Sequence, residues 1–132
     1  MDLVIDVGNS ETVIGLVESE GLHLVAHWRV STPVPRTVDE YGLLLRALLR
    51  NDDFAPKDVR MASIASVVPG VTGIVTETLE RLLGEAPVVV TAQSALPIRL
   101  DVEEPLSVGA DRIVNTLAAK EMYGRDTIAV DL

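Results

Sequence analysis

The chain has no cysteine, which excludes disulfide bonds, thiolate-bound zinc and a cysteine nucleophile. Aromatic residues are also scarce, at 3% of 132 residues, although 48% of the residues are hydrophobic. Valine, leucine, isoleucine and alanine must therefore build the core, which favours layered α/β packing over an aromatic-rich β-sandwich. No apolar run approaches the ~20 residues of a membrane span, and no basic segment precedes an apolar core at the N-terminus. We therefore expect a single-domain cytoplasmic protein.

Positive charge is scarce as well, because 11 lysines and arginines face 20 aspartates and glutamates, for a net charge of −9. A broadly acidic surface argues against nucleic acid and against an anionic membrane as main partners. An anionic substrate would need local donors or a metal ion. No Gly-x-Ser-x-Gly elbow supports a serine nucleophile. His23 and His27, about 13 Å apart at the rise of a strand, are too distant to share a metal.

What the chain does contain is an alternation of strand and helix patterns. Apolar β-branched runs predict strands, and apolar residues at helical spacing predict helices, the first of them behind a capping box at Thr37 and Glu40. Three antiparallel strands followed by βα units resemble a ribonuclease-H-like half-domain, a mixed sheet with helices on both faces. The expected strands cover residues 2–7, 12–17, 22–30, 61–68, 87–91 and 127–130, and the expected helices cover 37–51, 71–83 and 108–123.

A glycine turn follows the first apolar run, with Asp6 at the end of the strand. A carboxylate there is costly unless it is paired or bound to a metal. Gly8 allows close backbone approach, Asn9 tolerates left-handed geometry, and Ser10 and Thr12 add hydroxyl donors. The turn is therefore either a phosphate cradle or a plain hairpin turn in which Asp6 serves as a cap.

A second candidate lies where the last helix opens with Gly109-Ala110-Asp111-Arg112. Asp111 is either a partner of the helix dipole or a general base that accepts a proton from an attacking hydroxyl. Backbone N–H groups around Gly109 and the guanidinium of Arg112 suit a substrate carboxylate.

A third carboxylate, Asp131, ends the last expected strand as Asp6 ends the first. Strands one and four of a ribonuclease-H-like sheet lie side by side, so we expect these two aspartates to face one cation-binding cleft. With Asp111 they form three carboxyl groups that are predicted to converge on a common pocket for phosphoryl transfer.

Several sequence blocks together resemble the type III pantothenate kinase family, of the actin and sugar-kinase superfamily. The resemblance implies ATP-dependent phosphorylation of the primary hydroxyl of pantothenate, the first committed step toward coenzyme A. Residues 1–132 would then be the N-terminal ribonuclease-H-like half-domain and end where the second half begins. The blocks are Asp6-Val7-Gly8-Asn9-Ser10-Glu11-Thr12, Ser66-Val67-Val68-Pro69, Pro105 followed by Val108-Gly109-Ala110-Asp111-Arg112-Ile113-Val114-Asn115, and Val130-Asp131.

The resemblance also implies roles for individual residues. Asp111 would accept the proton, Asp131 would bind a monovalent cation, potassium or ammonium, and Asp6 would meet magnesium through Mg-ATP. Family members are homodimers. The ATP phosphates would lie on Asp6, Val7, Gly8, Asn9, Ser10, Glu11, Thr12 and Val13, and pantothenate on Gly109, Ala110, Asp111 and Arg112.

The sequence departs from the family pattern at three positions. Ser10 replaces the usual Thr, Glu11 replaces a common Asn, and Val102 replaces a substrate-contacting Tyr. A second phosphate loop, Gly-Thr-Ala-Thr-Thr in many members, should begin just after Leu132, so we expect no appreciable kinase activity from this chain alone. Two alternatives remain open: a non-catalytic accessory or regulatory homologue, and a nuclease whose carboxylate cluster would hold two metals.

Overall fold

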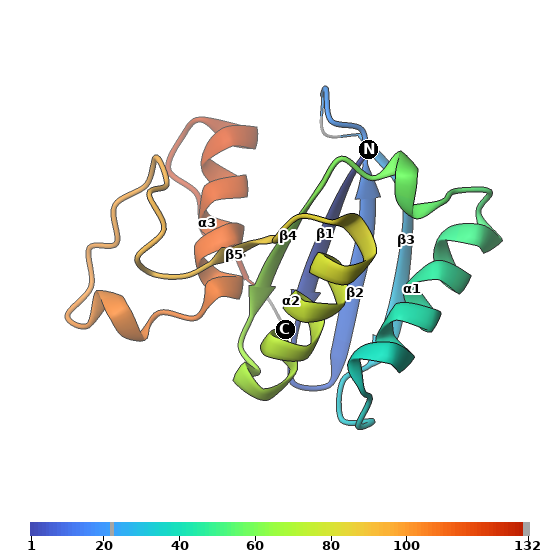
Figure 1. The fold of residues 1–132 in the computed structure, drawn as a ribbon. Coiled ribbons are helices and arrows are strands. Elements are labelled where there is room, and N and C mark those ends of the chain that lie inside the picture. Colours follow the sequence, from blue (N-terminus) through green and yellow to red (C-terminus); the bar gives the residue numbers. More distant parts are fainter. Residues whose placement is uncertain (22, 131–132) are drawn as a thin grey trace.

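The computed structural model describes residues 1–21 and 23–130 (Figure 1). Within these residues a five-stranded mixed sheet has the order β3-β2-β1-β4-β5. The first three strands form an antiparallel meander, while β4 runs parallel to β1 and β5 runs parallel to β4. This topology is the ribonuclease-H-like arrangement that the sequence predicts. The strands are β1 (Asp2–Val7), β2 (Glu11–Val17), β3 (Leu24–Ser31), β4 (Met61–Ser66) and β5 (Val88–Val90).

Helices cover both faces of this sheet. α1 (Val38–Asn51) and α2 (Pro69–Leu83) pack together over one face (Figure 1). α3 (Ala110–Tyr123) packs against β4 from the other face and buries Ala110 and Ile113. Irregular chain joins β5 to α3 and includes a short 3-10 turn, Pro105–Ser107, beside the sheet (Figure 1).

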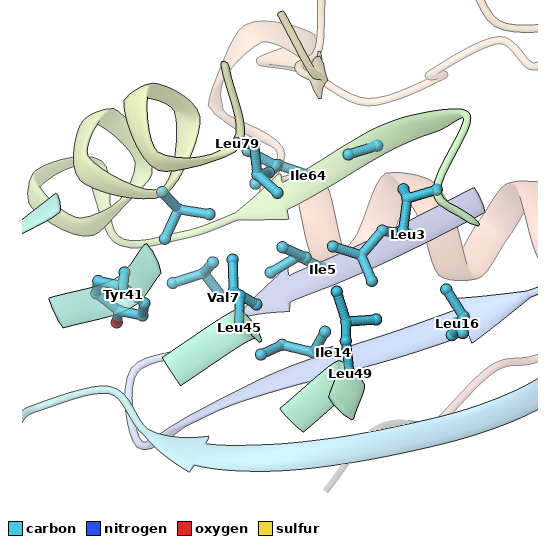
Figure 2. Packing of buried hydrophobic residues seen from close by; sticks show 13 residues of the cluster. Leu3, Ile5, Val7, Ile14, Leu16, Tyr41, Leu45, Leu49, Ile64 and Leu79 are labelled. Carbon is cyan, nitrogen blue, oxygen red and sulfur yellow. The ribbon is translucent and has the colours of Figure 1, made fainter. Parts of the chain in front are cut away.

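The main core lies between the sheet and the helix pair α1 and α2 (Figure 2). Alternation along β1 sends every second side chain into this layer and leaves the others on the α3 face. Each buried aliphatic side chain contributes roughly 1.5–3 kcal/mol relative to an exposed one. With few aromatics, the layer is almost wholly aliphatic, as predicted. Its central members are Leu3, Ile5, Val7, Ile14, Leu16, Tyr41, Leu45, Leu49, Ile64 and Leu79.

The start of α1 confirms the predicted capping box. The Thr37 hydroxyl accepts from the Glu40 backbone N–H at 3.3 Å, and the Glu40 carboxylate accepts from the Thr37 N–H at 2.7 Å. The N–H and hydroxyl of Thr37 hold the pKa of Glu40 below its ordinary value. At the ends of the other two helices, Gly84 and Gly124 adopt the left-handed conformation of helix stops.

Two predicted boundaries around β4 and α2 are wrong. β4 ends at Ser66 rather than at Val68, and α2 begins at Pro69 rather than at Val71. Proline has no N–H to lose in a first helical turn, so Pro69 starts the helix instead of merely closing the strand. The last helix likewise begins at Ala110 and not at Val108, with Gly109 at its N-cap.

The strand predicted over residues 127–130 is not formed. Ile128 and Val130 are 90% and 74% exposed. Strand hydrogen bonds come from a neighbouring strand, and no strand within the described residues pairs with this segment. An apolar run predicts a strand only where a partner is available.

Candidate functional site

The turn between β1 and β2 favours glycine for steric reasons. The Gly8 N–H donates to the Glu11 carbonyl at 3.0 Å, and a Cβ on Gly8 would lie only 3.0 Å from that same oxygen. Asn9 and Ser10 are exposed at the tip. The turn therefore presents backbone and short polar side chains at the carboxyl end of β1, as a phosphate cradle would.

Thr12 supports this turn from inside. Its side chain is 1% exposed, and its hydroxyl lies 2.8 Å from the hydroxyl of Thr32. The Thr32 N–H also donates to the Ser10 carbonyl at 3.0 Å. The Thr12 hydroxyl is therefore buried beneath the turn, and Ser10 carries the exposed hydroxyl.

Glu11 forms an ion pair that sequence reasoning missed. Its carboxylate lies 3.3 Å from the Arg29 guanidinium of β3, and both side chains are more than half exposed. Glu11 is registered opposite Ser31, so Arg29 is its diagonal neighbour across the two strands. The sequence does contain these two opposite charges, but they can be recognised as a pair only once the register between β2 and β3 is known.

Asp6 lies on the face of the sheet opposite the main core. It lines a cavity of about 450 Å³ together with Val114 and Asn115 of α3. Val4 and Gly15 form part of the floor, which is largely apolar. Asp6 is thus exposed at the end of β1, with residues from the same helix as Asp111 across the cavity.

Asp111 lies in the first turn of α3, with its carboxylate directly over Gly109. A Cβ on Gly109 would collide with Asp111 Oδ1 and would lie 3.3 Å from Val67 Cγ1. Asp111 Oδ1 is buried and has no hydrogen-bond partner among the described residues. A buried acceptor without a donor costs about 1–3 kcal/mol, so a donor from outside the described residues would stabilise this oxygen.

The start of α3 also lies close to the glycine turn. Val67, whose Cγ1 would lie 3.3 Å from a Cβ added to Gly109, donates its N–H to the Val7 carbonyl at 3.1 Å, one residue before Gly8. Val67, which directly follows β4, therefore lies between the end of β1, where the predicted phosphate turn begins, and Gly109, beside the predicted base Asp111. Arg112 and Asn115 are exposed on the helix.

The remaining predicted positions are less informative. Asp131 lies outside the described residues, so the convergence of three carboxyl groups stays a prediction. The predicted pairing of strands one and four is confirmed, since β4 lies beside β1, but β4 ends at Ser66 and residues 127–130 form no strand, so this pairing does not bring the segment before Asp131 next to Asp6. Val102 is 53% exposed. Among residues 1–21 and 23–130, no three histidine or acidic side chains are grouped to hold a metal.

No helix in the described part of the chain has the length and apolar character of a membrane span.

Comparison with known proteins shows which family the chain matches. A family model described as Type III pantothenate kinase matches residues 2–132. The chain belongs to the type III pantothenate kinase family. The match covers the glycine turn after β1, the Pro69 start of α2 and the Asp111 turn of α3.

Relatives named type III pantothenate kinase are similar along the whole chain. That of Moorella thermoacetica is 43% identical, over 99% of this chain and 51% of its own length. That of Thermobifida fusca is 40% identical, over 99% of this chain and 50% of its own length. The chain therefore spans about half the length of the relatives it matches. Among solved structures, the ethanolamine utilization protein EutJ from Carboxydothermus hydrogenoformans superposes with a TM-score of 0.44 at 15% identity, over 67% of this chain and 43% of that one.

Proposed function

We propose that this chain is the part of a type III pantothenate kinase that holds the first ATP phosphate turn, the general base and the pantothenate contacts. Family membership supports the substrate pair. The observation that carries the chemistry is the Asp111 carboxylate, fixed over Gly109 with one buried oxygen lacking a donor. A substrate hydroxyl is the donor that such an oxygen suits.

In the proposed reaction Asp111 accepts the proton of the pantothenate primary hydroxyl. The hydroxyl oxygen bonds to the γ-phosphorus of ATP while the bond from that phosphorus to the bridging oxygen breaks. ADP then leaves with the electron pair of that bond. Little covalent chemistry falls to the protein, so the position of Asp111 relative to the phosphate turn decides the rate.

The ATP phosphates are proposed to lie on the turn from Asp6 to Val13, where Asn9 and Ser10 are exposed. The Arg29 pair supports this, since it offsets the negative charge of Glu11 beside the turn. Magnesium bound with ATP would neutralise phosphate charge, and the exposed Asp6 carboxylate suits a contact with it. A potassium or ammonium ion at Asp131 remains part of the proposal.

Pantothenate is proposed to bind along Gly109, Ala110, Asp111 and Arg112, with its carboxylate on the exposed Arg112 guanidinium. A cytoplasmic homodimer engaged in coenzyme A biosynthesis is the corresponding proposal for the whole protein.

A coupled assay of ADP release by the intact protein tests this function. We expect ADP release that depends on pantothenate and that ceases when pantothenate is replaced by its analogue without the primary hydroxyl. Calorimetry separates the main alternative, because an accessory homologue would bind pantothenate without any turnover. Binding without turnover, or absence of both, would contradict the proposal.

A further inference from the structure

A second cavity, of about 340 Å³, lies beneath the loop that follows β3. Its walls come from that loop, from α1 and from the start of α2, and only Asn9 belongs to the phosphate turn. Arg36 lines the cavity, and no acidic side chain among residues 1–21 and 23–130 does, although the chain carries a net charge of −9. The local charge thus favours an anion, and the volume is that of a small-molecule pocket.

Tyr41 lines this cavity and carries a buried, unsatisfied hydroxyl. The residue is 3% exposed and lines the cavity, and its hydroxyl has no hydrogen-bond partner among the described residues. The ring belongs to the main core, at the end of the cluster beyond Val7 and Leu45 (Figure 2). Because that packing fixes the ring, the hydroxyl cannot turn to water without disrupting the core.

Arg36 is held beside the same ring. Its guanidinium carbon lies 5.5 Å from the Tyr41 ring centroid, and Nη1 donates to the Ser31 carbonyl at 2.8 Å. A guanidinium has five N–H donors, so others remain for a ligand. The nearby Glu40 carboxylate accepts from the backbone N–H and hydroxyl of Thr37.

We propose that this cavity binds a small aliphatic carboxylate. The carboxylate accepts from the Tyr41 hydroxyl and the Arg36 guanidinium, and the alkyl group packs against the apolar wall that includes Val34, Val68 and Ile74. The Tyr41 hydroxyl is sealed from solvent, so the exposed loop of residues 33–35 must shift slightly when the ligand enters. This site shares Asn9 with the proposed phosphate turn, but carboxylate binding there does not depend on the proposed kinase chemistry.

Titration of the protein with isovalerate, followed by amide NMR shifts, tests the proposal. We expect saturable shifts confined to the loop after β3, Tyr41 and the start of α2, with a dissociation constant of about 1 mM or below. Isovaleramide, which has the same shape without the charge, should bind about tenfold more weakly. Absence of saturation up to about 20 mM isovalerate, or equal binding of the amide, would overturn the proposal.

Two variants locate the binding. Tyr41→Phe keeps the ring and removes a hydroxyl that has no partner, so it should fold normally and bind isovalerate about tenfold more weakly. Arg36→Gln should weaken binding to a similar extent and provides a second test. Tyr123→Phe is the matched control, because Tyr123 is 55% exposed and lies in α3. Unchanged affinity in both Tyr41→Phe and Arg36→Gln would show that the carboxylate binds elsewhere.

Discussion

At the scale of single residues, two glycines determine where the polar groups of the site can lie. Gly8 allows its N–H to reach the Glu11 carbonyl and close the turn. Gly109 leaves the space beside its Cα free for the Asp111 carboxylate. Neither glycine has a positive φ, so close approach and not backbone strain is the reason for glycine. The positions of the proposed functional side chains thus depend on the space that these two glycines leave.

Gly109→Ala should move the Asp111 carboxylate, because the new methyl group would collide with Oδ1. We expect kcat to fall by about 10²-fold with little change in far-UV circular dichroism. Gly73→Ala is the control, since its Cβ would meet nothing within 4 Å and it lies inside α2. That control should raise the free energy of unfolding by about 0.5–1 kcal/mol and leave kcat unchanged. Normal turnover in Gly109→Ala would show that the carboxylate position is irrelevant.

Arg29→Ala should expose the charge of Glu11 beside the phosphate turn. Since both side chains are largely exposed, we expect a modest effect, a rise of about two- to fivefold in KM for ATP. Adding Glu11→Gln to Arg29→Ala should restore the original KM. Initial-rate measurements over a range of ATP concentrations test this, and a double variant no better than Arg29→Ala would refute the role of the pair.

At the scale of elements, an ion pair joins the starts of β1 and β4. The Arg60 guanidinium donates to both oxygens of Asp2, at 3.1 and 3.0 Å, and the Ser19 hydroxyl adds a bond of 3.0 Å. These donors, Arg60 first, hold the pKa of Asp2 below its ordinary value of 3.8. A carboxyl whose pKa is lower in the folded state than in the unfolded state stabilises the fold at pH values above its unfolded-state pKa. This contribution is lost as the pH falls through its folded-state pKa.

Arg60→Ala should therefore lower the free energy of unfolding near pH 7, by the modest amount expected of a largely exposed guanidinium. The difference from the unsubstituted protein should shrink below about pH 4, as Asp2 becomes protonated in both. Denaturant melts at a series of pH values measure this difference. Arg99→Ala is the control, because Arg99 and Asp101 are about nine-tenths exposed. A difference that stays constant down to pH 2 would exclude Asp2 as its source.

Some elements and contacts could be predicted from the sequence alone, and others could not. The β1–β2 hairpin and the capped start of α1 were predictable, because alternation, turn residues and caps are local properties. The segment 127–130 was not, because a strand depends on a partner that period-two alternation does not reveal. The Asp111 turn was predictable from its motif, whereas the Arg29 partner of Glu11 depended on the register between β2 and β3.

At the scale of the whole molecule, this chain corresponds to about half of its relatives. Its cavity beside Asp6 opens on the face that α3 covers in part, and the proposed phosphate turn lies at the carboxyl end of the central strand β1. Phosphoryl transfer needs groups around both the attacking and the leaving oxygen. We therefore expect residues 1–132 alone to show no pantothenate-dependent ADP release, and turnover by this polypeptide in a coupled assay would contradict that expectation.

The most direct test of the account is the turnover of Asp111→Asn in the intact protein. We predict a fall in kcat of about 10²- to 10⁴-fold with nearly unchanged pantothenate affinity, because the amide fills the same space but cannot accept the proton. Asp39→Asn, in the first turn of α1, is the matched control and should retain full activity. A kcat for Asp111→Asn equal to that of the unsubstituted protein would contradict the assignment of the base.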